Sequence, residues 1–194
     1  GAGITAAVLD SGVYMHPDLK GRIVEFQDFV SKKTYPYDNN GHGTHICGIL
    51  CGSGQLSNGS YQGIAPQAKL IVGKVLNNAG KGTVETLITG IHWVIRMKKK
   101  YEIRILNISI GTEVTPETDQ NSKLVRAVEA AWESGIVVVI AAGNNGPLPG
   151  SITTPGIAKK VITVGASDDA VPIWIDGKRL QNYSGRGNPN IDLI

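Results

Sequence analysis

The chain has 194 residues, of which 41% are hydrophobic and 18% charged, a composition typical of a globular domain with a core of its own. Its formal net charge of +3 is too small, and its basic residues too dispersed, to indicate a nucleic-acid or membrane partner. The one basic run, the three lysines at 98–100, falls where a helix is expected to end, and cations there complement the helix dipole. No apolar run reaches the roughly 18 residues that a membrane-spanning helix needs.

The predicted elements alternate between strand and helix from the first residues onward. Residues 4–9 are mostly apolar and end at Asp10, Ser11 and Gly12, and such a run bounded by turn residues is typical of a buried parallel strand. Further strands are expected at residues 23–29, 69–76, 103–110, 136–142 and 161–166. Helices are expected at residues 42–51 and 83–100, and a third is marked by Leu124, Val128 and Trp132 and stopped by Gly135.

Residues 171–180 differ from the rest, because Asp176-Gly177 stands there between alternating residues and predicts a hairpin. Elsewhere strands and helices alternate at the length of parallel crossovers. The sequence therefore predicts one α/β domain, residues 1–194, built on a doubly wound, mainly parallel sheet.

Two cysteines, Cys47 and Cys51, lie four residues apart on the predicted helix 42–51, so their side chains are neighbours one turn apart. A disulfide or half of a metal site fits this spacing, but helix geometry poorly suits the short Cβ–Cβ distance of a disulfide. We interpret them as two buried thiols on the core face of the helix. Free thiols favour a reducing compartment.

Residues 38–45, Asp-Asn-Asn-Gly-His-Gly-Thr-His, concentrate more chemistry than any other stretch. His42 stands between two glycines at the start of a predicted helix, where no Cβ blocks its approach and the ring edge can face a cleft. His42 is therefore the candidate general base, against the simpler interpretation of a capping or core histidine. His45 is interpreted as a structural residue packed behind His42.

Two more polar residues follow predicted strands. Asp10 ends the strand at 4–9 and Asn144 follows the strand at 136–142, and catalytic groups gather at the carboxyl ends of strands in open α/β sheets. Both residue types also fit plain turn-forming roles. An acid beside a histidine fixes its tautomer and stabilises the imidazolium, and an amide can stabilise an oxyanion at about 3 kcal/mol in known cases. An acid, a base and an oxyanion donor together indicate acyl transfer, but these residues do not include a nucleophile.

Several motifs stand in the order found in subtilisin-like serine proteases. They are Asp-Ser-Gly at 10–12, Gly-His-Gly-Thr-His at 41–45, Asn-Ile-Ser-Ile-Gly at 107–111 and Ala-Ala-Gly-Asn at 141–144. Pro-Gly at 155–156, the strand at 161–166 and Tyr-Ser-Gly-Arg-Gly at 183–187 fit the same family. The resemblance covers essentially the whole chain and is greatest to the intracellular-type bacterial branch; the Asp–His–Ser order itself is known from subtilisin.

The resemblance implies a serine endopeptidase in which Asp10 is the triad acid, His42 the triad base and Asn144 the oxyanion donor. It also implies a substrate-binding set, with an extended segment that pairs with the peptide as an added strand. That segment consists of Ser109, Ile110 and Gly111, and Gly80 and Gly82 are its counterpart on the other side of the peptide. The pocket for the residue before the scissile bond has Ala141, Ala142 and Gly143 as one wall. Thr153 lies near the base of this pocket. The Thr154–Pro155 peptide bond is expected to be cis.

The resemblance stops short of the nucleophile. The family's serine lies in a Gly-Thr-Ser-Met-Ala block that opens a late helix, no such block is present, and Ser184 belongs to the block before it. We therefore expect the subtilisin-like domain to be incomplete at both ends, the serine to lie downstream of Ile194, and this chain to be inactive alone. Without the late helix some apolar surface should be uncovered.

The resemblance implies polypeptide substrates, and as further partners its own pro-segment or the missing C-terminal part. The compartment is left open, because free thiols favour the cytoplasm while the family at large is secreted.

Two other functions are open at this point. A naturally truncated pseudoprotease would bind extended peptides through residues 109–111 without cutting them. A metal hydrolase would use Asp10, His42 and His45, although no other strong ligand is evident for it. No cofactor or metal is expected: calcium is common in the family but usually draws on carboxylates, and the loop at 53–63 has none.

Overall fold

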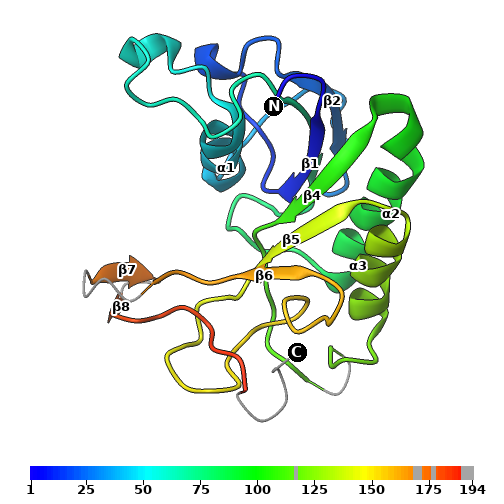
Figure 1. The fold of residues 1–194 in the computed structure, drawn as a ribbon, viewed down its shortest axis with the longest axis vertical. Helices are drawn as coiled ribbons and strands as arrows, with labels where there is room; N and C mark the ends of the chain where they lie inside the picture. Colours follow the sequence, from blue (N-terminus) through cyan, green and yellow to red (C-terminus); the bar gives the residue numbers. More distant parts are fainter. Residues whose placement is uncertain (116–117, 168–171, 176–177, 189–194) are drawn as a thin grey trace. The chain divides into compact units, whose positions relative to one another are not determined.

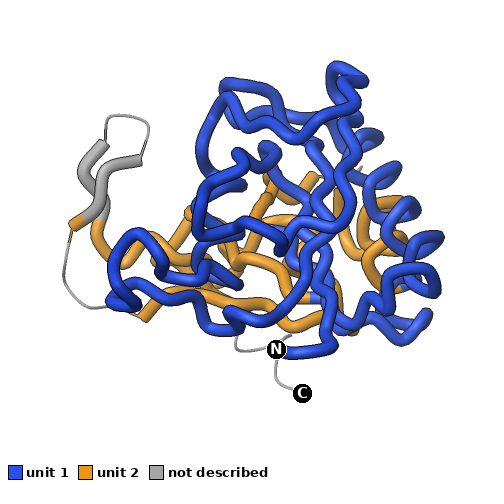
Figure 2. The backbone as a smooth tube through the Cα atoms, turned by 90° about the horizontal axis from the view of Figure 1, so that it is seen from above, with its two compact units in different colours: residues 1–108, 130–138 blue, residues 109–129, 139–194 orange. Residues whose placement is uncertain are grey.

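The computed structural model describes residues 1–115, 118–167, 172–175 and 178–188 (Figure 1). The chain divides into two compact units (Figure 2). The first consists of residues 1–108 and 130–138, and the second of residues 109–129 and 139–194. No helix among the described residues is long and apolar enough to cross a membrane.

The first unit contains four parallel strands and two long helices. The strands lie in the order β2-β3-β1-β4, and each neighbouring pair is parallel. Their bounds are Thr5–Asp10 for β1, Ile23–Asp28 for β2, Lys69–Lys74 for β3 and Ile103–Ile108 for β4. The helices are α1, His42–Cys51, and α2, Val84–Tyr101, with short 3-10 turns η1 at Pro17–Leu19 and η2 at Gln55–Ser57.

Strand β1 is buried along its whole length because helices cover both of its faces. Ala6 and Val8 belong to the core cluster that also holds Cys47 of α1. Leu9 points the other way, where it lies against Gly90 of α2. Figure 1 shows α1 and α2 on opposite sides of the strands. Burial on both faces explains why the strand is continuously apolar rather than alternating.

The carboxyl ends of three neighbouring strands carry charged residues side by side. In the register of the sheet Lys74 of β3 lies opposite Asp10 of β1 on one side and opposite Asp28 of β2 on the other. All three side chains belong to buried residues. The loops that follow these strands therefore start from a buried row of two acids and one base.

The second unit is built from shorter elements. Strand β5, Val137–Ala141, and helix α3, Lys123–Glu133, each have residues in both units. Within the second unit β5 pairs in parallel with β6, Ile162–Val164, and strands β7, Ile173–Ile175, and β8, Lys178–Leu180, form an antiparallel pair. The Thr154–Pro155 bond is cis, as expected, and so is Gly146–Pro147, which the sequence did not indicate.

The α/β fold with a mainly parallel sheet is confirmed, and the differences are at element ends. Strand β3 ends at Lys74, two residues before the predicted end, because the N–H groups of Val75 and Leu76 both donate to the carbonyl of Asp10. Strand β4 ends at Ile108 rather than at 110, and β6 spans only Ile162–Val164. The β7–β8 pair bears out the predicted hairpin strands, while Asp176-Gly177, the predicted turn, lies outside the described residues.

Candidate active site

Asp10 ends β1 as a fully buried carboxylate. Its Oδ1 accepts hydrogen bonds from the N–H of Ser11 at 2.6 Å and from Nδ1 of His42 at 2.8 Å. Its backbone carbonyl accepts from the N–H groups of Val75 and Leu76, at 2.8 and 3.2 Å. The residues after β3 thus hold the backbone of Asp10, while its carboxylate accepts the hydrogen bond from His42.

His42 is the first residue of α1, and glycines on both sides make its position there attainable. Gly41, the N-cap, has φ 102°, a left-handed conformation that favours glycine. A Cβ at Gly43 would stand 2.2 Å from the carbonyl oxygen of Gly12, so only glycine lets the helix start lie directly on the segment that follows β1. The N–H of Gly43 donates to Oγ of Ser11 at 2.9 Å.

The imidazole of His42 is 46% exposed and is bonded through Nδ1 to the buried carboxylate of Asp10. Because Asp10 accepts at Nδ1, that nitrogen carries the proton and Nε2 is left as the basic, outward nitrogen. The hydrogen bond with Asp10 raises the pKa of His42, partial burial opposes this, and the charges of Asp10 and Asp38 add to the increase. The ring is therefore a stronger base than an isolated imidazole, and accessible.

Asp38 carries the hydrogen bonds that fix the start of α1, and the sequence analysis assigned it no role. Its Oδ1 accepts from Oγ of Ser11 and from the N–H groups of Asn40 and Gly41, at 3.0, 3.1 and 2.9 Å. Its Oδ2 accepts from the N–H and the hydroxyl of Thr44, at 2.9 and 2.6 Å. Burial acts to raise the pKa of Asp38, but these hydrogen bonds outweigh it and lower the pKa to about 2. An Asp shortly before a helix start was the available signal.

The loop of residues 77–82 lies beside the same edge of the first unit. The side-chain amide of Asn40 donates to the carbonyl of Asn78 at 3.1 Å, and the N–H of Asn77 donates to the carbonyl of Lys81 at 2.8 Å. Gly80 has φ 70° and, like Gly82, is exposed. The structure thus brings the predicted substrate-binding glycines into a loop that is tied to the segment before His42.

The remaining predicted site residues belong to the second unit. Ser109, Ile110 and Gly111 follow β4 without a regular element, and Thr112 forms an antiparallel bridge with Thr154, N–H to carbonyl at 2.9 Å in both directions. Ala141 ends β5, Ala142 and Gly143 follow it, and Asn144 comes next as an exposed residue.

Thr153 is buried beside this segment, where its N–H donates to the carbonyl of Ala142 at 3.1 Å. Gly111 and Gly143 both face Thr153, because a Cβ at either glycine would stand 2.1 or 2.3 Å from its Oγ1. The structure thus gathers Gly111, Ala142, Gly143 and Thr153 in one place.

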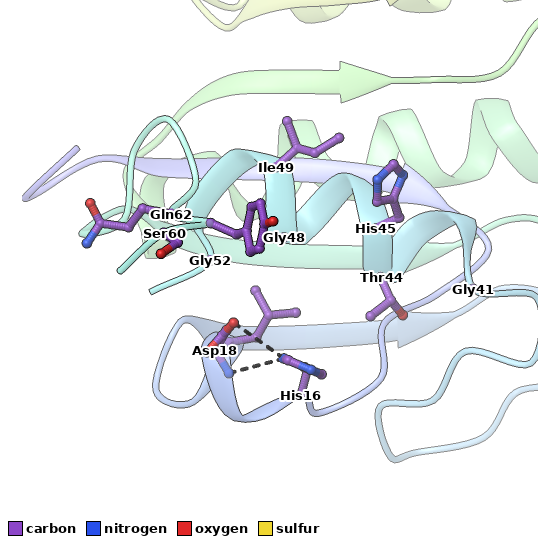
Figure 3. Close-up of a pocket in the computed structure, with 12 residues that line it drawn as sticks. His16, Asp18, Gly41, Thr44, His45, Gly48, Ile49, Gly52, Ser60 and Gln62 are labelled. Carbon is purple, nitrogen blue, oxygen red and sulfur yellow. Dashed lines mark hydrogen bonds and ion pairs between the residues drawn. The ribbon is translucent and has the colours of Figure 1, made fainter. Parts of the chain in front are cut away.

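His45 is not packed behind His42, as the sequence analysis expected, but is exposed. It lines a groove of about 690 Å³ along α1, together with Thr44, Ile49 and Tyr61 (Figure 3). Ile49 and Tyr61 are 50% and 84% exposed. Three residues along a helix correspond to about 300° of rotation, and here that turn carries His45 onto a face that the first unit leaves uncovered.

Cys47 and Cys51 are free thiols and both are fully buried, as predicted. Burial raises the pKa of both, that of Cys51 to about 11. Within the described ranges no group of three or more His, Cys, Asp or Glu side chains is arranged to hold a metal ion. The metal-hydrolase alternative therefore has no ligand set in this part of the chain.

A parallel α/β unit that holds a histidine against a buried carboxylate at the carboxyl edge of its sheet is typical of hydrolases that use a triad. A family model described as the subtilase family matches residues 1–192. The chain belongs to the subtilase family.

Relatives of known name agree with this membership. The serine protease AprX of Bacillus subtilis (strain 168) is 48% identical over 191 residues, which are 96% of this chain and 43% of the relative. A subtilisin of Bacillus sp. (strain TA39) is 34% identical over 194 residues, 96% of this chain and 44% of the relative. The solved structure of sphericase superposes with a TM-score of 0.80 at 32% identity, over 98% of this chain and 61% of that one. The chain thus spans less than half the length of these two curated relatives.

Proposed function

We propose that this chain supplies the acid and the base of a serine endopeptidase whose nucleophilic serine lies outside these 194 residues. The observation that carries the proposal is the 2.8 Å bond between Nδ1 of an accessible His42 and Oδ1 of a fully buried Asp10. Membership of the subtilase family and the likeness to named serine proteases support it.

In this function His42 moves one proton in each half of the reaction. In the first half its Nε2 accepts the proton of the attacking serine hydroxyl and gives it to the amine that leaves as the peptide bond breaks, which leaves an acyl-serine ester. In the second half Nε2 accepts a proton from the attacking water and returns it to the serine oxygen as the ester bond breaks. Asp10 stays ionised, holds the proton-bearing Nδ1 and stabilises the imidazolium between the two transfers. Asn144 donates its side-chain amide to the oxygen that becomes negative in the tetrahedral intermediate.

The peptide substrate binds in extended form. Residues 109–111 offer main-chain groups to which the peptide pairs as an added strand, and the family resemblance gives Gly80 and Gly82 a matching main-chain role. No metal or cofactor takes part, because the acid, base and amide supply the proton transfers and charge stabilisation that acyl transfer requires. The pro-segment that the family resemblance implies would bind to the same residues as a peptide.

Thr153 limits the side chain that is accepted before the scissile bond. Its Oγ1 stands where Cβ atoms on Gly111 and Gly143 would point, so a β-branched residue fills the space between the two walls of the pocket. Each methylene that a pocket admits or rejects changes kcat/KM by about 10- to 200-fold. We expect cleavage after small residues such as Ala, and Thr153→Gly to raise the Phe-to-Ala ratio of kcat/KM at least about tenfold, with Thr153→Ser in between.

The groove along α1 supports the view that another element completes the site. Ile49, on the helix that begins with His42, and Tyr61 expose apolar surface in this groove. In the family the serine opens a late helix that is buried in the domain centre. We propose that this helix covers the exposed side of α1.

The test compares the full-length protein with its His42→Ala and His45→Ala variants on an unfolded protein substrate. Endopeptidase products from the wild type and from His45→Ala, and none from His42→Ala, are the expected result. Binding of the substrate without cleavage by the wild type would overturn the proposal and favour a peptide-binding pseudoprotease.

A further inference from the structure

Lys74 is a lysine in the interior of the first unit. It ends β3, between Asp10 of β1 and Asp28 of β2, and it is only 1% exposed. Burying an ammonium costs free energy unless its three protons are hydrogen-bonded, so the hydrogen-bond partners of Lys74 indicate its role.

The ammonium of Lys74 donates to three neutral oxygens that come from three different segments. Nζ lies 2.5 Å from the carbonyl oxygen of Ser11, which follows Asp10. It lies 3.0 Å from Oδ1 of Asn39, three residues before His42, and 2.7 Å from the carbonyl oxygen of Leu76. One side chain thus links the segment after the triad acid to the loop before the triad base.

The ring of Tyr37 completes the surroundings of the ammonium. Nζ lies 5.0 Å from the ring centroid, within cation–π range. The hydroxyl of Tyr37 donates to Oδ2 of Asp28 at 2.7 Å, and the N–H groups of Val30 and Ser31 donate to Oδ1 of Asp28 at 2.8 and 2.9 Å. The loop of residues 29–41 is therefore fixed at its base, and Lys74 holds its far end through Asn39.

The charges around Lys74 are mostly negative. The charged and titratable groups that act on it are Asp10 from β1, Asp28 from β2, and Asp38, Lys33 and Tyr37 from the loop. None of its three hydrogen bonds is to a carboxylate. Oδ2 of Asp10 is buried with no hydrogen-bond partner among the described residues, and Lys74 is a nearby cation that interacts with the charge of this carboxylate.

We propose that Lys74 is a positioning residue for the Asp10–His42 pair, tying the two segments that carry them and offsetting part of the buried negative charge around them. The inference rests on the proposed function and goes beyond the triad itself. Asp10 and Asp38 are the acidic groups that act on His42, and the first turn of its own helix has none. Without Lys74 these two acids would hold the imidazolium more tightly, and the base would be less available near neutral pH.

The first test measures the pKa of His42 in the full-length protein by NMR titration, with His42→Ala to assign its resonance. Lys74→Met removes the buried charge with little change in side-chain volume. Lys69→Met is the matched control, because it makes the same change on the same strand about 16 Å away, at an exposed end. The pKa of His42 should rise by about 0.3 to 1 unit in Lys74→Met and stay unchanged in Lys69→Met.

The second test separates the tether from the charge and survives a failure of Lys74→Met to fold. Asn39→Ala removes one of the three acceptors at an exposed residue and leaves the charge of Lys74 in place. We expect kcat to fall by about three- to tenfold with KM unchanged, because positioning of the base is impaired and peptide binding is not.

A wild-type pKa of His42 in folded Lys74→Met, or a wild-type kcat in Asn39→Ala, would overturn the proposal. Failure of the proposed function is a separate result. A wild-type protein that cleaves no peptide would refute the endopeptidase assignment, whereas the NMR titration would still show whether Lys74 acts on the Asp10–His42 pair.

Discussion

Asp38→Asn tests whether the start of α1 depends on one carboxylate. An asparagine keeps one oxygen but replaces the other with an NH2 group. In the wild type the N–H of Thr44 donates to Oδ2 of Asp38 at 2.9 Å. If the asparagine keeps its oxygen near Asn40 and Gly41, this N–H faces the NH2 group of the amide, which is itself a donor. The substitution thus leaves a helix-start N–H unpaired while hardly changing side-chain volume.

The cost follows from how far the fold lowers the pKa of Asp38. A decrease from 3.8 to about 2 corresponds to about 2.4 kcal/mol, at 1.36 kcal/mol per unit. Because Asp38 is only partly buried, solvent screening reduces this to about 1–2 kcal/mol. A pKa lowered in the folded state gives stability that is complete above the unfolded value of 3.8 and is lost as the pH falls through about 2.

The assay is urea unfolding of the full-length protein, with the enzyme inhibited, at pH 7 and at the lowest pH where both proteins stay folded. We expect Asp38→Asn to be about 1–2 kcal/mol less stable at pH 7, with the difference shrinking as the pH approaches 2. Asp18→Asn, at a similarly half-buried acid that accepts a bond from Leu56, is the control and should cost less. A difference below about 0.3 kcal/mol, or one that does not change with pH, would refute the reasoning.

Four further predictions concern the site and its core. The acid limb of the kcat/KM–pH profile should lie above pH 6.5, because the pKa of His42 is raised and activity is lost as the ring is protonated. Asp10→Asn should lower kcat about 10⁴-fold, because it favours the wrong tautomer of His42. An unchanged rate would contradict the role of the Asp10–His42 pair in catalysis. Asn144→Ala should lower kcat by about 10²–10³ with little effect on KM, which steady-state kinetics can check. Cys47 and Cys51 should resist iodoacetamide at pH 8 in the native protein and react in guanidinium, as peptide mass spectrometry can show, because both thiols are fully buried and their pKa values are raised.

The sequence was sufficient to predict the elements that are determined by neighbouring residues in the chain. Helix α1 begins at His42 and ends at Cys51 as predicted, because glycines mark its start and Gly52 its end. Asp10 at the end of β1 followed from an apolar run bounded by turn residues. Local sequence was not enough to predict the pairing of Asp10 with His42, because these residues are 32 apart in the chain. The order of the family's motifs indicated this pairing, and the structure then showed it.

The residues that the sequence analysis missed act over long separations. Ser11 donates to Asp38 across 27 residues and accepts from Lys74 across 63, and nothing in either local sequence predicts the contact. A lysine at the end of an apolar run is normally solvated, so the burial of Lys74 shows only once β3 is flanked by β1 and β2. His45 was misplaced because helical spacing alone does not say which face a neighbouring element covers.

The central claim is that Asp10 and His42 activate a serine, and labelling with a fluorophosphonate probe tests it most directly. The full-length wild-type protein should be labelled on one serine outside residues 1–194, while His42→Ala should be labelled far more slowly and the 194-residue chain not at all. Equal labelling of the wild type and His42→Ala, or labelling of a serine within these residues, would contradict the account.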